Sequence, residues 1–310
     1  MLKNKNIAVT GGAGFLGTCV VNELVKCGAD MKKIYVPRSK DYDLRDENAV
    51  ERMLDDSKAD ILFHLAANTG GADYYKAHPA AIYHDNLKMG INLLEAARKR
   101  KLEKIVIIGT GLAYPRTAAI PYQERSIFDG YPEETAAPYG LSSRALLEYS
   151  MYLRKEYGID SIYLIPANLY GPGDHYSLEI GHVIPATIVR LSEAIKNNDE
   201  EIIMRGSNNS REFLYVEDAA RAIVAAAGKY NSPLPLNIGT GKSILLKEVM
   251  EELIRLMKFR GRIKWEGSGE GASRRCFDVT RMKQELGFEP KTEIKEGLRK
   301  TVEDYLKKHG

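Results

Sequence analysis

The chain has 310 residues, 44% hydrophobic and 28% charged, which is ordinary for a globular protein with one large α/β unit or a core domain and a smaller one. The formal net charge of +3 is too small to indicate nucleic-acid or membrane-surface binding. No apolar run is long enough to span a bilayer and the first residues lack a secretory signal, so we expect a cytoplasmic protein. Three cysteines without a C-x-x-C pair and six histidines without H-E-x-x-H spacing indicate neither a metal site nor a disulfide framework.

Apolar runs alternate with amphipathic stretches through the first half of the chain. The runs at 7–10, 33–36, 60–66, 104–108 and 161–165 predict strands. The stretches at 15–27, 79–101 and 139–157 predict helices. This β-α-β-α order predicts an α/β fold, a doubly wound parallel Rossmann sheet, over residues 1–166.

After Pro166 this rhythm changes. The sequence predicts strands at 201–204, 211–216 and 236–238, and helices at 184–197, 217–229 and 245–259. The Gly/Ser-rich stretch 266–275 predicts a mobile loop. We therefore expect a smaller C-terminal substrate-binding lobe over residues 167–310, interleaved with the last elements of the Rossmann sheet.

A glycine-rich turn, GGAGFLG, lies between the first predicted strand and helix. Gly11 permits a tight turn, Gly14 lets a pyrophosphate approach the backbone, and Gly17 allows close packing of the helix. The helix N-terminus offers free N–H groups and a positive dipole end to phosphates. The turn therefore predicts binding of a nicotinamide dinucleotide.

The end of the second predicted strand carries Arg38 and Ser39 where NAD-specific sites usually place an acidic residue. A guanidinium matches phosphate geometry, so this position favours NADP(H). NAD(H) stays possible, because Arg38 can equally be a solvated surface residue.

Motifs along nearly the whole chain resemble those of the extended short-chain dehydrogenase/reductase (NAD-dependent epimerase/dehydratase) family. Within it they are most similar to the branch that epimerises and reduces GDP-4-keto-6-deoxy-mannose. The motifs are TGGAGFLG (10–17), PRSKDYDLR (37–45), HLAA (64–67), IGTGLAYP (108–115), APYGLSSR (137–144), NLYGPGD (168–174), GHVIPA (181–186), REFLYVEDAA (211–220) and RRCFD (274–278).

The resemblance implies a role for each matching residue. It implies a homodimer joined by the helices at 79–101 and 139–157, to which Leu146, Leu147 and Met151 would contribute. It makes Thr110 the hydrogen-bond partner of the reacting sugar oxygen, Tyr139 the proton donor or acceptor at C4, and His182 an acid in epimerisation. Substrate contacts fall on Thr110, Asn168, Val183, Arg190, Arg211 and Arg275. Cofactor contacts fall on Gly11, Gly14, Phe15, Leu16, Gly17, Arg38, Asp43, Leu44, Leu65, Ala66, Ala67, Ile108, Gly109, Tyr139, Pro166, Asn168, Leu169 and His182.

Two positions depart from the family pattern. Ser143 stands where a lysine should follow Tyr139 by four residues, a spacing that puts both on one helix face. The adjacent Arg144 is rotated by about 100° around a helix and does not simply replace that lysine. Leu112 stands where the family has the cysteine base of epimerisation, which puts 3,5-epimerisation in doubt.

Candidate replacement bases are Asp73, Tyr74 and Tyr114, each more readily explained as a structural or binding residue. Gly111 and Leu112 after Thr110 also lack the Asp-Glu pair of the family's dehydratases.

Three functions remain open. The favoured one is an NADP(H)-dependent 4-keto reductase/epimerase of a nucleotide sugar, with GDP as the favoured nucleotide and an altered active site. The second is a nucleotide-sugar epimerase that holds and recycles its NAD(P). The third is a catalytically weakened protein that still binds nucleotide sugar and NADP.

Overall fold

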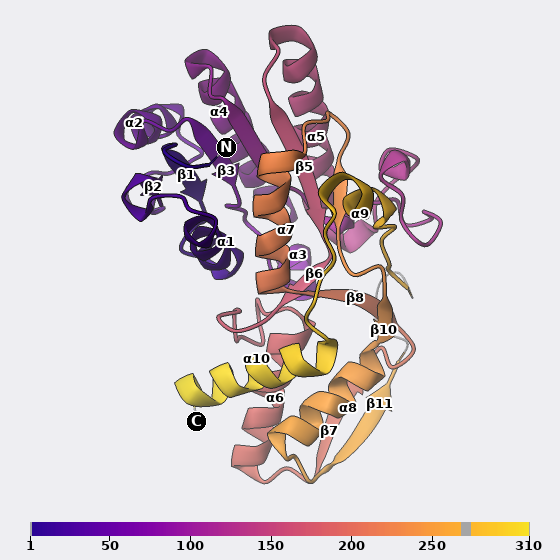
Figure 1. Cartoon of the computed structure of the whole chain (residues 1–310). Helices are drawn as coiled ribbons and strands as arrows, with labels where there is room; N and C mark the ends of the chain where they lie inside the picture. The colour runs from indigo at the N-terminus through magenta and orange to yellow at the C-terminus, as the bar shows by residue number, and fades with distance from the viewer. Residues whose placement is uncertain (1, 268–273, 310) are drawn as a thin grey trace.

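The computed structural model describes residues 2–267 and 274–309, and a parallel sheet forms the centre of the upper part in Figure 1. In the part of the chain described, this sheet has six strands. In spatial order they are β2 (Ile34–Tyr35), β1 (Ile7–Thr10), β3 (Ile61–His64), β4 (Lys104–Ile108), β5 (Ser161–Pro166) and β9 (Leu236–Ile238). β1 and β3 are buried along their whole length, which explains their unbroken apolar sequences.

Helices cover both faces of the central sheet (Figure 1). α1 and α7 pack together, and so do α4 and α5. Gly90 in α4 allows close approach of α5, because a Cβ there would lie 2.4 Å from the Leu146 side chain. The helices around this sheet are α1 (Phe15–Lys26), α2 (Glu47–Ser57), α4 (Pro79–Arg100), α5 (Ala137–Tyr157), α7 (Val216–Lys229) and α9 (Thr280–Leu286). The predicted α/β Rossmann class is confirmed.

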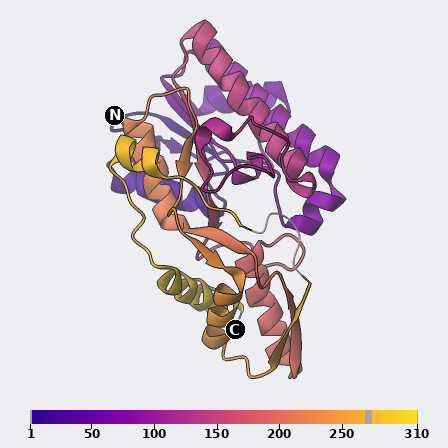
Figure 2. The same cartoon turned by 90° about the vertical axis from the view of Figure 1, so that its right-hand side faces the viewer.

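The second lobe lies below the central sheet in Figures 1 and 2 and has a hydrophobic core of its own. The chain enters it directly from β5, with Ala167 alone between β5 and β6. Its strands are β6 (Asn168–Tyr170), β8 (Ser210–Tyr215) and β10 (Ser243–Leu245) in one sheet, and β7 (Glu201–Arg205) with β11 (Arg262–Glu266) in another. Its helices are α6 (Val183–Asn197), α8 (Leu246–Met257) and α10 (Ile294–His309).

Several elements differ from the sequence prediction. α2, α10 and the short α3 (Ala72–Ala77) were not predicted, and neither were four 3₁₀ turns, η1 (Met31–Lys33), η2 (Gly111–Ala113), η3 (Glu124–Ser126) and η4 (Glu134–Ala136). α5 begins two residues earlier than predicted because Pro138 suits a first helical turn. Of the predicted loop 266–275, Glu266 ends β11 and residues 268–273 lie outside the described residues.

The assignment of Leu146 and Leu147 to a dimer face is wrong. Both are buried in the chain's own core, with 6% and 0% of their surface exposed. The Leu146 side chain packs against Gly90 of the neighbouring helix α4.

Within the described ranges, no helix combines the length and apolar character that a membrane crossing needs. The same residues contain no cluster of three or more His, Cys, Asp or Glu placed to hold a metal ion.

Candidate active site

The turn after β1 closes tightly around three glycines. Gly11 has a φ of +70°, and its carbonyl oxygen accepts the Gly14 N–H at 2.9 Å. A Cβ at Gly17 would lie 2.0 Å from that same oxygen, so α1 packs against the turn only without a side chain there. Gly14 is the N-cap residue of α1 and has no side chain to cap it. The N–H groups of the first helical turn therefore stay available to phosphate oxygens.

A cavity of about 440 Å³ opens beside this turn, at the carboxyl ends of β1, β2 and β3. Parallel α/β sheets bind ligands at this edge. The predicted cofactor residues that line it are Gly11, Gly14, Arg38, Asp43, Leu44, Ala66 and Ala67. Tyr42, Arg45, Asn68, Asp85 and Met89 also line it and were not predicted.

The two arginines of this cavity differ in their neighbours. Arg45 contacts Asp43 at 2.8 Å and Asp85 at 3.3 Å, and its hydrogen bonds lower the pKa of Asp43 to about 2. Arg38 is exposed and forms no ion pair with any residue that the structure describes. Arg38 therefore carries a charge at this cavity that no described acid pairs with.

The other predicted cofactor residues stand at element ends around the same edge. Phe15, Leu16 and Gly17 begin α1, Leu65 follows β3, Ile108 ends β4 and Gly109 follows it, Pro166, Asn168 and Leu169 span the step from β5 to β6, and His182 precedes α6.

The helix that carries Tyr139, α5, packs against η2, the turn that begins after Thr110. Thr110 follows β4, and its Oγ1 accepts the Leu112 N–H at 3.2 Å. Tyr139 lies in the first turn of α5, beside Gly140, where a Cβ would lie 2.4 Å from the Leu112 carbonyl oxygen. The small residue after Tyr139 therefore brings the phenol to the loop that carries Thr110.

An aromatic side chain that was not predicted as a site residue covers Tyr139. The Tyr75 ring from α3 stacks on it with centroids 6.0 Å apart and 20° between the planes. Burial, and then the neighbouring phenols of Tyr75 and Tyr163, raise the pKa of Tyr139, while a hydrogen bond with Thr69 opposes them. The Tyr139 phenol therefore stays protonated at neutral pH.

The lysine position on α5 holds a different arrangement. Ser143 is buried and its Oγ lies 2.5 Å from the Tyr163 hydroxyl. Arg144 points elsewhere, donating from Nε to the Ala113 carbonyl and from Nη1 to the Gly130 carbonyl, each at 2.6 Å. The arginine thus holds the loop after Thr110 and does not replace the lysine.

Leu112 packs in a small apolar cluster with Tyr75 and Tyr139. Of the proposed replacement bases, Tyr114 is 3% exposed and donates to Asn237 Oδ1 at 2.7 Å, which makes it structural. Tyr74 donates to Asn68 Oδ1 at 2.8 Å, and Asp73 is exposed in the first turn of α3.

His182 borders the site from the second lobe. The His182 side chain is exposed at its surface, but many protein atoms lie close enough around it to reduce its solvation. That burial, and then the charge of His175, lower the pKa of its imidazole. His182 is therefore neutral at neutral pH.

Two predicted substrate arginines lie close to each other. Burial, and then Arg275, lower the pKa of Arg211 to about 10. Tyr122 lies near both guanidinium groups, and the charge of Glu133 acts on Arg211 against the lowering of its pKa. Two adjacent cations at a partly buried position form a site suited to an anion. Arg190 is exposed on α6, whose first residue is Val183.

A buried acid, Glu212, lies beside Arg211 in β8 and is 1% exposed. Its Oε1 accepts the N–H groups of Thr240 and Gly241 at 2.6 and 2.9 Å, and its Oε2 accepts that of Phe277 at 2.6 Å. This carboxylate ties β8 to the segment that carries Arg275. The sequence offers no sign of this role, because partners so distant in the chain cannot be inferred from spacing.

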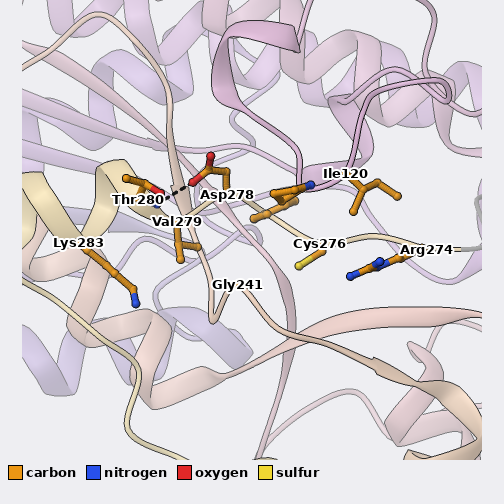
Figure 3. A pocket seen from close by; sticks show the side chains of 10 residues that line it. Ile120, Gly241, Arg274, Cys276, Asp278, Val279, Thr280 and Lys283 are labelled. Atoms are coloured by element: carbon orange, nitrogen blue, oxygen red, sulfur yellow. Dashed lines mark hydrogen bonds between the residues drawn. The ribbon is translucent and has the colours of Figure 1, made fainter.

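A second cavity, of about 340 Å³, lies outside this constellation (Figure 3). Cys276, Asp278, Thr280 and Lys283 from one segment face it together with Ile120. None of the predicted catalytic residues is among its described lining residues.

Comparison with known proteins places this arrangement among known enzymes. The profile described as "NAD dependent epimerase/dehydratase family" matches residues 7–239. The chain belongs to this family.

Individual members agree over the whole chain. A GDP-L-fucose synthase of Sinorhizobium fredii is 32% identical, covering 99% of this chain and 97% of the relative. A probable GDP-L-fucose synthase 1 of Oryza sativa is 31% identical, covering 98% and 93%. A GDP-mannoheptose C4 reductase from Campylobacter jejuni, solved with NADP bound, has the same fold, with a TM-score of 0.87 over 99% of each chain at 23% identity.

These findings confirm the family resemblance and the predicted kind of enzyme, an NAD(P)-dependent oxidoreductase or epimerase of sugar nucleotides. They leave the roles of individual residues as predictions.

Proposed function

We propose that this chain reduces the 4-keto group of a nucleotide sugar with NADPH and does not epimerise C3 and C5. The observation that carries the proposal is Tyr139, a protonated phenol in the first turn of α5, which packs against the η2 turn that follows Thr110. Reduction of a ketone needs a proton donor, and oxidation of an alcohol needs a base. Tyr139 is protonated at neutral pH, so it has the proton that reduction needs, whereas oxidation would need the tyrosinate.

In the proposed reaction, the cofactor provides the hydride and the side chains of the protein provide the proton. Bound NADPH supplies a hydride to the carbonyl carbon. Thr110 holds the carbonyl oxygen, and Tyr139 gives that oxygen its proton, so that the ketone becomes an alcohol. Leu112 cannot abstract a proton from C3 or C5, which is why the proposal ends at reduction.

The arginine pair supports a diphosphate substrate. Arg211 and Arg275 lie close together without a strong acidic neutraliser among the described residues. Two phosphate charges would compensate them, and arginine forms bidentate bonds to phosphate oxygens. Relatives named GDP-L-fucose synthases support GDP as the nucleotide. Arg38 supports NADPH over NADH.

We also propose that two copies associate through α4 and α5. Both helices carry exposed tyrosines, Tyr83 at 38% and Tyr152 at 57% exposure. Light scattering of the purified protein measures the mass directly, and a monomer across the micromolar range would contradict this arrangement.

The reaction is tested with NADPH and a GDP-4-keto-6-deoxy sugar in D₂O. We expect loss of absorbance at 340 nm and an alcohol product with no solvent deuterium at C3 or C5. Tyr139→Phe should lower kcat roughly 100-fold or more. Failure to oxidise NADPH with any 4-keto nucleotide sugar would refute the reduction, and deuterium at C3 or C5 would refute the absence of epimerisation.

A further inference from the structure

Tyr163, in the middle of β5, is buried directly below the catalytic edge. It is 2% exposed and pairs in register with Ile107 of β4. Its ring occupies the space above Gly109, where a Cβ would lie 2.2 Å from Tyr163 Cε1 and 2.6 Å from its hydroxyl oxygen. Gly109 immediately precedes Thr110, so the ring supports the end of the strand that presents Thr110.

The hydroxyl of Tyr163 holds the other side of the site. It donates to the Ser143 carbonyl at 2.8 Å, and Ser143 Oγ lies 2.5 Å away and donates in return. Ser143 is 5% exposed and lies one helical turn after Tyr139, on the same face of α5. Tyr163 also lies close enough to Tyr139 to influence it electrostatically.

These contacts fill the position of the family's lysine. A longer side chain at residue 143 would meet the Tyr163 hydroxyl, and its ammonium would be buried against neutral groups. The absence of the lysine is therefore matched by a second residue, twenty positions later, that takes the same space.

We propose that Tyr163 is a positioning residue for the reaction, acting through Ser143 to clamp the Tyr139 turn of α5 against the Thr110 end of β4. We call this pair the Ser143–Tyr163 clamp. The inference rests on the proposed function and adds to it that a neutral hydroxyl pair occupies the position of the family's lysine and fixes the helix that carries Tyr139.

The first test compares Tyr163→Phe with Tyr230→Phe. Tyr230 is also buried, at 1% exposure, and its hydroxyl donates to the Leu234 carbonyl at 2.8 Å, away from the catalytic edge. Both variants lose a buried hydrogen bond and should unfold at lower temperature. Only Tyr163→Phe should lower kcat, by roughly 10-fold, with the KM for the sugar nucleotide unchanged. Equal kcat values in the two variants would overturn the inference.

The second test exchanges the pair. Ser143→Lys alone forces an ammonium against the phenol, so NADPH affinity and kcat should both fall. Combining S143K with Y163S makes room for the lysine. Affinity and rate should then exceed those of the single variant, and the basic limb of the pH–rate profile should move down by roughly 1–3 units. A single variant as good as the double variant would overturn the inference.

NADPH titration separates this inference from the proposed function. If the wild-type protein turns over no keto sugar, the proposed function fails, while the affinities of S143K and S143K/Y163S still decide whether Tyr163 occupies the lysine space. If the wild type is active and Y163F matches Y230F, only the inference fails.

Discussion

Asp174, in the loop between β6 and α6, is a buried carboxyl group with half of its hydrogen-bonding capacity unused. It is 6% exposed, and its Oδ1 accepts the His175 N–H at 2.7 Å. Its Oδ2 has no hydrogen-bond partner among the described residues. Burial raises the pKa of Asp174 to about 6 from 3.8, against the opposing effects of the His175 N–H and charge.

The raised pKa of Asp174 determines whether the folded protein gains or loses stability as pH rises. Between about pH 4 and pH 6 the folded protein retains a proton on Asp174 that the unfolded chain has released, so stability falls as pH rises through this window. The penalty is absent below about pH 4 and complete above about pH 6. A pKa shift of about two units at about 1.4 kcal/mol each gives roughly 3 kcal/mol. Asp174→Asn keeps the shape without the charge.

We therefore expect Asp174→Asn to be more stable than the wild type by roughly 2–3 kcal/mol at pH 7.5, and equal to it at pH 4. The measurement is urea unfolding of both proteins across pH 4–8, because subtraction cancels the groups they share.

Asp304→Asn is the control of opposite sign. Although burial works against it, bonds from the Gly173 N–H and Lys308 lower the pKa of Asp304 below its usual 3.8, so across pH 4–8 its amide variant should be less stable than the wild type by a nearly constant amount. A difference for Asp174→Asn that does not vary with pH, or a less stable variant at pH 7.5, would refute the reasoning.

Three further predictions concern the cofactor turn, cofactor choice and the substrate segment. Gly17→Ala places a methyl group 2.0 Å from the Gly11 oxygen, so NADPH affinity in a fluorescence titration should fall roughly 100-fold or more. Gly228→Ala in α7, where a Cβ meets nothing within 4 Å, should leave that affinity unchanged, and equal affinities in the two variants would contradict the turn geometry. Arg38→Ala should raise the Kd for NADPH roughly 10- to 100-fold and leave that for NADH nearly constant, and an equal loss for both cofactors would remove Arg38 from the 2′-phosphate. Glu212→Gln turns one acceptor into a donor facing a backbone N–H, so the free energy of unfolding in urea should fall by about 1–3 kcal/mol. The KM for the sugar nucleotide should rise, because Glu212 holds the segment that carries Arg275. If neither the unfolding free energy nor the KM changes, Glu212 does not hold that segment.

Local patterns predicted some elements well and missed others for identifiable reasons. Buried strands such as β1 and β4 have the predicted bounds, because a parallel strand covered on both faces is a nearly continuous apolar run. α2 was missed although Asp46 caps its first turn, accepting the Asn48 N–H at 3.0 Å. A polar helix against one face of the sheet carries a weaker apolar signal than a buried strand.

In the candidate site, too, local sequence patterns reveal some features and miss others. The changes at Ser143 and Leu112 could be recognised from spacing within a motif. The partner of Ser143 could not, because Tyr163 reaches it only where α5 packs against β5. Likewise, Glu212 meets Phe277 across a distance in sequence that no local pattern encodes. Motifs thus identify which residue changed, while the packing of helix against strand identifies what compensates for it.

The pairing of β5 with β9 has a consequence for how the protein is made. β5 ends at Pro166, but its neighbour on the outer side begins only at Leu236. During synthesis, the apolar edge of β5 emerges long before the strand that covers it, and unpaired edges of this kind invite association with other chains. The residues between β5 and β9 must therefore be translated before the edge of β5 is covered and protected from aggregation. A fragment ending at residue 166 would retain the glycine turn and leave that edge permanently open.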